Sequence, residues 1–202
     1  MCAIIGSFSP EKIRELYEIN SYRGALSYSL ATFSSTWIYN VQVNDLVQAK
    51  GILPHELPLK EVQGSLIVGH SQAPTTQATN IHPAIIGENM MWHNGIVKQK
   101  SLDKDMWDTS WLLEQIIDYG WSSLSRVDGT FACVLYKDGK LYIFRNEISP
   151  LYYDRELNIS STKFEGAIDL PPNRVYELDI VNKRLLEVAQ FQTFENPYYI
   201  PE

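Results

Sequence analysis

The chain has 202 residues, of which 45% are hydrophobic and 20% charged, and its formal net charge at pH 7 is −7. This composition is typical of globular domains and excludes the low-hydrophobicity, high-charge class of disordered chains. An acidic chain has no electrostatic reason to bind nucleic-acid phosphates or an anionic membrane surface, so small molecules or proteins are the expected partners.

The length predicts a single domain over residues 1–202, because a chain of this size can bury one substantial core. No window holds the roughly 18 apolar residues of a membrane span, and the first residues lack a basic segment followed by an apolar stretch. Cys2 and Cys133 could in principle pair, but two cysteines without a disulfide framework suit a reducing compartment. Cys133 stands in an apolar run, where cysteine usually packs as a small hydrophobe. A cytoplasmic location is expected.

The first half of the chain predicts two kinds of element. Residues 2–6 are a short apolar run closed by glycine, which indicates a buried strand. Residues 9–20 begin with Ser-Pro and carry apolar residues at helical spacing, so a helix is expected there. Residues 26–47 favour two antiparallel strands, and residues 65–70 favour another buried strand. The polar residues 71–80 are expected to form an exposed loop.

The middle of the chain predicts a hairpin and a helix. Residues 84–92 fit a hairpin whose second strand delivers residues 93–95 at its far end. Residues 109–119 present one apolar face, with Asp108 placed to cap the helix and Gly120 placed to end it.

The rest of the chain is expected to be mostly strand. Residues 130–136 and 140–145 read as a hairpin that turns at an Asp-Gly pair, and residues 174–180 as a further strand. The last ~20 residues carry no clear pattern. Many strands and only two helices predict an α+β fold of antiparallel sheets with helices outside.

Cys2 is the first residue with distinctive chemistry. Removal of Met1 would leave it with a thiol and an α-amine on one residue. The amine titrates at about 7.7–8.0 and the thiol at about 8.5, so the amine can accept the thiol proton near neutral pH. A cysteine at the second position can also be accidental.

Cys2 stands at the head of seven further short segments that occur in a fixed order. They are Tyr22-Arg23-Gly24, Gly69-His70-Ser71, Asn80-Ile81-His82-Pro83, His93-Asn94-Gly95-Ile96, Asp108-Thr109, and residues 127–132 and 145–152. In order and spacing the set resembles the class II glutamine amidotransferases, which are N-terminal nucleophile hydrolases. The last two segments look most like the glutaminase domain of asparagine synthetase. The resemblance covers residues 1 to about 178 and leaves a C-terminal tail, 179–202.

The resemblance implies a four-layer αββα sandwich of two antiparallel sheets. It also implies that Cys2 attacks the side-chain amide of glutamine, expels ammonia and leaves a thioester that water hydrolyses. Asn94 and Gly95 match the residues whose side-chain amide and backbone N–H form the oxyanion hole of the family. The Asn-Gly pair could instead form a tight turn.

Two charged residues match substrate-site positions of the family. Asp108 matches the aspartate that holds the α-ammonium of glutamine, although helix capping is a rival role. Arg23 matches the arginine of the Tyr-Arg-Gly element close to the nucleophile, although a surface arginine after a helix would look the same.

Gln72 is the clearest departure from the family pattern, because the family has an arginine at this position that binds the substrate α-carboxylate. A neutral amide removes a bidentate, charge-assisted contact. Three explanations stay open. Gln72 holds the carboxylate weakly with Ser71 or Thr75, another arginine reaches in, or the substrate is not free glutamine.

No cofactor or metal is expected. The chain has no phosphate-binding glycine loop, and His70, His82 and His93 lack the close pairing of a zinc site. The sequence ends where the glutaminase domain would end, so an acceptor for ammonia is expected on a separate synthetase subunit, or is absent. The chain is thus a glutamine amidohydrolase, an amidohydrolase for a different amide or γ-glutamyl compound, or a catalytically inactive binding subunit.

Overall fold

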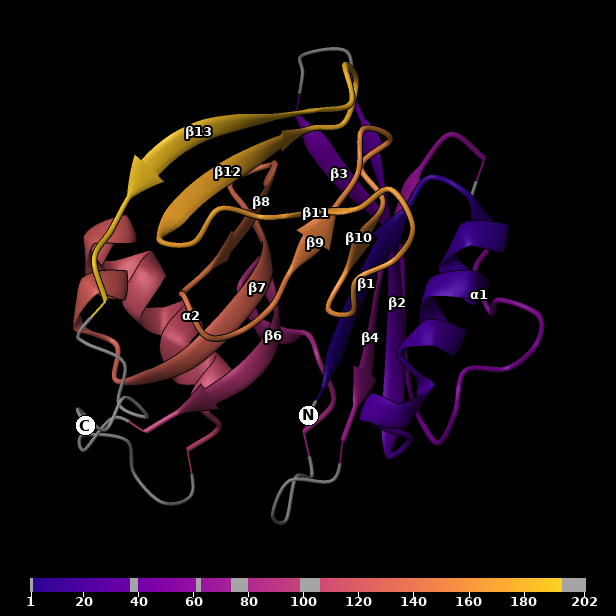
Figure 1. Cartoon of the computed structure of the whole chain (residues 1–202), viewed down its shortest axis with the longest axis horizontal. Coiled ribbons are helices and arrows are strands. Elements are labelled where there is room, and N and C mark those ends of the chain that lie inside the picture. Colours follow the sequence, from indigo (N-terminus) through magenta and orange to yellow (C-terminus); the bar gives the residue numbers. More distant parts are fainter. Residues whose placement is uncertain (1, 37–39, 61–62, 74–79, 99–105, 194–202) are drawn as a thin grey trace.

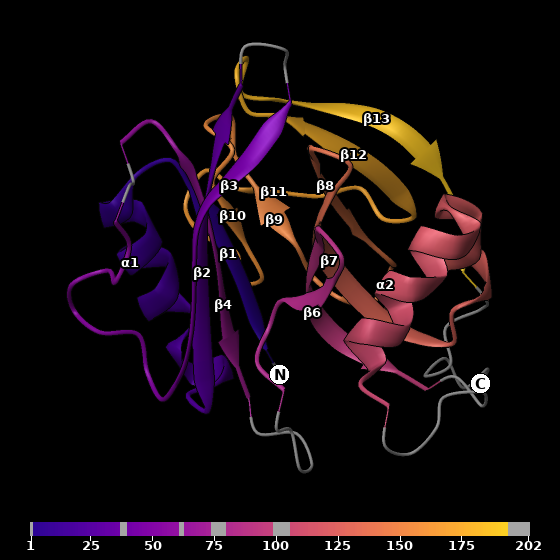
Figure 2. The same cartoon turned by 180° about the vertical axis from the view of Figure 1, so that it is seen from behind.

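The computed structural model describes the chain except residues 1, 37–39, 61–62, 74–79, 99–105 and 194–202. Two antiparallel sheets lie face to face, and one α-helix covers the outer side of each (Figures 1 and 2). No helix among the described residues is long and apolar enough to cross a bilayer.

The first sheet has the strand order β11-β9-β10-β1-β4-β2-β3. Its strands are β1 (Ala3–Ser7), β2 (Ser27–Ser35), β3 (Val41–Lys50), β4 (Leu66–Gln72), β9 (Tyr152–Tyr153), β10 (Ile159–Ser160) and β11 (Ile168–Asp169). Every residue of β1 and β4 is buried, which explains why both read as continuous apolar runs rather than alternating ones. Ala3 pairs with Ser71, so the start of β1 lies beside the end of β4.

The second sheet has the strand order β13-β12-β8-β7-β6-β5. Its strands are β5 (Ala84–Ile86), β6 (Asn89–Val97), β7 (Gly129–Lys137), β8 (Lys140–Arg145), β12 (Arg174–Asp179) and β13 (Arg184–Gln190). The hairpin of β7 and β8 turns at Asp138 and Gly139, whose φ angles of 53° and 69° are those of the tight turn that an Asp-Gly pair favours.

Three apolar clusters hold the layers together. α1 (Pro10–Ile19) begins after Ser9, whose side chain accepts from the Lys12 N–H, and it packs Ile13 and Leu16 on the first sheet. α2 (Asp108–Tyr119) packs against the second sheet, where Cys133 is part of the apolar cluster. The cluster between the sheets includes Ile4, Phe33, Val68, Trp92 and Val134. The expected four-layer αββα sandwich is confirmed, with short 3-10 helices η1 (Ser21–Arg23) and η2 (Trp121–Arg126).

Four strands have no counterpart among the elements expected from the sequence. β13 lies inside the tail, 179–202, and pairs with β12 along most of its length. Most of its residues are exposed, so no buried face imposes an alternating apolar pattern on the sequence. β9, β10 and β11 have two residues each and are too short to show any periodicity.

Candidate active site

Cys2 lies directly before β1 and is half-buried. Burial raises the pKa of its thiol above the ordinary value of 9.0. A hydrogen bond from the Ala73 backbone and the positive charge of Arg23 lower this pKa, whereas the negative charge of Asp108 raises it. A backbone donor, a cation and a carboxylate, each from a different segment, therefore lie close enough to act on this sulfur.

Arg23 ends η1 and is only 8% exposed, so it is not a surface arginine. Its Nη1 lies 3.5 Å from the Cys2 carbonyl oxygen, Nη2 lies 3.0 Å from the Ser161 carbonyl oxygen, and Nε lies 2.9 Å from Thr162 Oγ1. All three nitrogens thus donate to the protein itself. The guanidinium supports the backbone that carries the nucleophile.

Ser71 and Gln72 are buried residues at the end of β4, so the expectation that they lie in an exposed loop is wrong. The sheet continues through them because β2 pairs with β4 as far as Ser27 opposite Gln72. The Ser71 hydroxyl donates to the Gly24 carbonyl oxygen, and the Ser27 hydroxyl donates to Gln72 Oε1 at 2.7 Å. A side chain at Gly24 would overlap the backbone of Gln72 and Ala73, which explains the glycine of the Tyr-Arg-Gly element.

Thr75, the remaining expected partner of Gln72, lies outside the described residues.

Asn94 and Gly95 lie within β6 and not in a turn, so the tight-turn alternative is wrong. Asn94 is buried, and its Nδ2 donates to Ser161 Oγ at 3.3 Å. The same oxygen accepts from the Ile4 N–H at 2.9 Å, which joins the Asn94 amide to the strand that follows Cys2. A side chain at Gly95 would overlap the Thr130 carbonyl oxygen, so the close approach of β7 requires glycine there.

Asp108 is the first residue of α2. The alternative role expected for it, capping of this helix, is wrong. The N-cap residue is Trp107, whose side chain makes no capping bond. The Asp108 carboxylate instead reaches across to β6, where Oδ2 accepts from the Val97 N–H at 3.2 Å and lies 3.9 Å from His93 Nδ1. Its side chain stays 24% exposed, which leaves part of the anion open to a ligand.

Three buried histidines lie behind Asp108. Thr109 Oγ1 is 3.1 Å from His82 Nε2 and 3.2 Å from His93 Nδ1. His93 Nε2 lies 3.3 Å from the Thr130 carbonyl oxygen, which can only accept, so a proton on Nε2 can donate to it. The Thr109 hydroxyl donates to Asp108 Oδ1 at 3.4 Å. His70 stacks on His82 with ring centroids 3.9 Å apart.

Burial keeps two of these rings neutral at physiological pH. Desolvation lowers the pKa of His70 to about 3 and that of His82 well below its ordinary value. Among the described residues, no group of histidine, cysteine and carboxylate side chains is arranged to hold a metal ion.

Ser161 and Ala73 make contacts at the site that nothing in the sequence indicates, and Thr109 belongs to the Asp108-Thr109 segment without an expected role of its own. Ser161 lies in the segment Ser160-Ser161-Thr162, which matches no motif. Its contacts to Ile4 and Asn94 form only when distant strands pack together.

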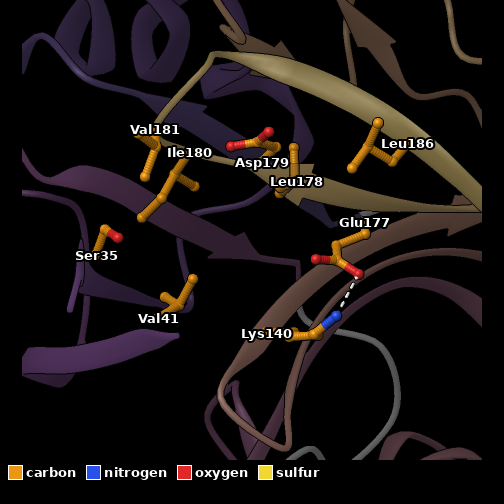
Figure 3. A pocket seen from close by; sticks show the side chains of 9 residues that line it. All are labelled: Ser35, Val41, Lys140, Glu177, Leu178, Asp179, Ile180, Val181 and Leu186. Carbon is orange, nitrogen blue, oxygen red and sulfur yellow. Dashed lines mark hydrogen bonds and ion pairs between the residues drawn. The ribbon is translucent and has the colours of Figure 1, made fainter. Parts of the chain in front are cut away.

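A cavity of about 200 Å³ lies elsewhere, at the end of the sandwich where β3 approaches β12 (Figure 3). The described residues that line it include Val41, Leu178, Ile180 and the ion pair of Lys140 with Glu177, which is 2.9 Å long. None of the candidate site residues lines it.

No protein-family model and no curated protein sequence matches the chain. Its fold is similar to that of glutamine phosphoribosylpyrophosphate amidotransferase from B. subtilis, solved with ADP and GMP, at a TM-score of 0.65 and 15% identity over 93% of this chain. It is also similar to an allosteric regulatory enzyme of purine biosynthesis, at a TM-score of 0.59 and 14% identity over 88% of this chain. The match covers 49% and 47% of those chains, so this chain spans about half their length. The chain thus shares the fold of the half of glutamine phosphoribosylpyrophosphate amidotransferase that it matches, with two antiparallel sheets between helices.

Proposed function

We propose that the chain is an amidohydrolase of the class II glutamine amidotransferase type, which uses Cys2 as its nucleophile after removal of Met1. The observation that carries the proposal is that the charges of Arg23 and Asp108 both act on the Cys2 thiol, while Ser161 ties the buried Asn94 amide to Ile4 in the strand that follows Cys2. These residues come from segments of both sheets and from α2.

The proposed reaction begins when the α-amine of Cys2 accepts the thiol proton and the sulfur attacks the side-chain amide carbon of glutamine. The Asn94 amide and the Gly95 N–H stabilise the negative charge on the carbonyl oxygen, a contribution worth about 2.7–4 kcal/mol for one donor. The carbon–nitrogen bond then breaks, and the leaving nitrogen takes the proton from the amine to become ammonia. Water, deprotonated by the amine, hydrolyses the thioester to glutamate and restores the thiol.

Asp108 is the proposed receptor for the substrate α-ammonium, because its carboxylate is partly exposed and is oriented by the Val97 N–H. Gln72, with Ser71 and Thr75, is proposed to hold the α-carboxylate. Ser71 and Gln72 already bond within the protein, so we expect weak binding of glutamine.

A second candidate function keeps the nucleophile and changes the substrate to a different amide or γ-glutamyl compound. It is favoured by the neutral Gln72 together with Arg23, whose nitrogens all donate to protein oxygens. Arg23 is the one basic side chain that acts on the Cys2 thiol among the described residues. Of these compounds, such a site would suit an amide whose α-carboxylate is neutralised, because a γ-glutamyl compound keeps the same α-carboxylate as glutamine.

Ammonia released by this reaction would serve a separate synthetase subunit in the cytoplasm, which we propose as the partner. Both cysteines are free thiols, which suits that reducing compartment.

The test measures glutamate and ammonia released from glutamine by the wild type, by Cys2→Ala and by the matched control Cys133→Ala. Release that needs Cys2 but not Cys133 supports the proposal. A parallel assay with glutamine α-amide, which neutralises the carboxylate, separates glutamine from an amide that lacks the α-carboxylate charge. Release from neither compound would favour a catalytically inactive binding subunit.

A further inference from the structure

We propose that Ser161 is a positioning residue that orients the Asn94 amide for the oxyanion, an inference that rests on the proposed function. Ser161 directly follows β10 and is fully buried. Its hydroxyl oxygen accepts two hydrogen bonds, from the Ile4 N–H at 2.9 Å and from Asn94 Nδ2 at 3.3 Å. One oxygen atom thus links the strand that bears the nucleophile to the amide on the opposite sheet.

The backbone of Ser161 is itself held by two hydrogen bonds. The Ser161 N–H donates to the Ile4 carbonyl oxygen at 2.9 Å, and the Ser161 carbonyl oxygen accepts from Arg23 Nη2 at 3.0 Å. Nη1 of the same guanidinium lies 3.5 Å from the Cys2 carbonyl oxygen. Ser161, Ile4 and Cys2 are therefore held as one unit, and the hydroxyl oxygen is a fixed acceptor for Asn94.

The geometry matters because an amide nitrogen carries two protons. The bond to Ser161 uses one proton and fixes the plane of the amide, which leaves the second N–H with a defined direction. A donor that is already aimed where charge develops needs no reorganisation during the reaction. Without Ser161 Oγ, the Asn94 side chain could rotate and its donor would reach the oxyanion only part of the time.

Ser160 is a matched control on the neighbouring position. It is also fully buried, and its hydroxyl oxygen accepts from Asn20 Nδ2 at 2.9 Å and from the Thr162 N–H at 3.0 Å. These partners lie beyond the end of α1 and after β10, and neither is Asn94 or Ile4. Ser160→Ala therefore removes a buried hydroxyl with the same number of bonds but without the link to Asn94.

The kinetic arm compares Ser161→Ala, Ser160→Ala, Asn94→Ala and the double variant of Asn94 and Ser161. We expect Ser161→Ala to lower kcat by about 10-fold or more, short of the ~10²–10³-fold loss of a whole oxyanion donor. KM should change less than about 2-fold, because the oxyanion contact forms only in the transition state. In the Asn94→Ala background the serine variant should add little, since residues that act through each other are non-additive.

The proposal is overturned if Ser161→Ala lowers kcat no more than Ser160→Ala does. It is also overturned if the loss of kcat in the double variant equals the product of the losses in Ser161→Ala and Asn94→Ala. The second result would mean that Ser161 acts through the backbone of β1 alone. Ser161→Cys keeps the side-chain volume with a weaker acceptor, and serves if the alanine variant does not fold in a thermal melt. Ser161→Thr keeps the hydroxyl and should retain most of the activity.

A structural arm decides the inference even if the wild type shows no Cys2-dependent turnover, a result that would defeat the proposed function alone. NMR spectra identify the Asn94 side-chain NH₂ signals by their loss in Asn94→Ala. We expect Ser161→Ala to shift these signals and to speed their hydrogen exchange, while Ser160→Ala leaves them in place. Unchanged Asn94 signals in Ser161→Ala would refute the positioning role.

Discussion

The carboxylate of Asp108 accepts a hydrogen bond from the backbone N–H of Val97, with Oδ2 3.2 Å from the nitrogen. The bond ties the first residue of α2 to β6, two residues beyond Gly95. It fixes an anion near the Cys2 thiol, whose pKa that anion raises. A carboxylate that makes the thiol less acidic does not help the nucleophile. Its position is better explained if it binds a cationic group of the substrate.

Asp108→Asn should lower the pKa of the Cys2 thiol, because it removes a negative charge that disfavours the thiolate. The rate of iodoacetamide alkylation of Cys2, followed against pH by mass spectrometry, should therefore reach its midpoint at lower pH. The same variant should raise KM for glutamine, since it loses a charge-assisted bond to the α-ammonium. Glu114→Gln on an exposed position of α2 is the control, and an alkylation midpoint shared by both variants would contradict the electrostatic role.

Gln72→Arg tests which substrate the site suits. If Gln72 already takes part in holding the α-carboxylate of glutamine, the buried arginine should leave kcat/KM for glutamine unimproved, because it also deprives the Ser27 hydroxyl of its acceptor. A rise of about 10-fold, equivalent to about 1.4 kcal/mol, would instead show that the wild-type site lacks a carboxylate receptor. That result would favour the second candidate function.

Acid should destabilise the fold through His70 and His82. Their pKa values in the folded protein are lowered, to about 3 for His70, from a value near 6.5 in the unfolded chain. Below pH 6.5 the unfolded chain binds more protons at these histidines than the folded chain does. The free energy of unfolding is therefore highest above pH 6.5 and falls as the pH falls toward 3. Each histidine should contribute a slope of about 1.4 kcal/mol per pH unit to the free energy of unfolding.

Urea unfolding of the wild type and of His82→Phe between pH 7 and pH 5 checks this slope. The variant lacks one titrating ring and should show a shallower dependence on pH, whatever its absolute stability. Parallel curves for the two proteins would mean that His82 does not titrate in this way.

Gly24→Ala should destabilise the protein by about 1–3 kcal/mol, the usual cost of forcing extra atoms into a packed site. The new side chain would overlap the backbone of Gln72 and Ala73, which cannot rotate away. Gly6→Ala is the control, because a side chain there would meet Ile159 at an ordinary contact distance of 3.4 Å. Equal losses of melting temperature in the two variants would contradict the close approach at Gly24.

Local features of the fold could be predicted from sequence because neighbouring residues determine them. Ser9 caps α1 as expected, and the Asp138-Gly139 pair forms the expected hairpin turn with positive φ at both residues. The buried strand after Cys2 was also expected and is confirmed. The fold as a whole follows from the family resemblance, because strand propensity alone does not choose a topology.

Long-range contacts could not be predicted in the same way. Ser71 and Gln72 look like loop residues until β2 pairs with them, and Asp108 looks like a helix cap until β6 supplies the Val97 N–H. Ser161 has no sequence signal, because its two partners lie 157 and 67 residues away along the chain. Polar residues whose role is fixed by distant strands are visible only once the strands are assembled.

Cys2, as the first residue of the mature chain, is proposed to form a thioester with the substrate. Intact mass spectrometry and peptide mapping of protein quenched in acid during turnover of glutamine test it most directly. We predict a chain that lacks Met1 and carries a γ-glutamyl group on Cys2, with no such group in Cys2→Ala. A chain that retains Met1, or one that turns over glutamine with its γ-glutamyl group on another residue, would contradict the account.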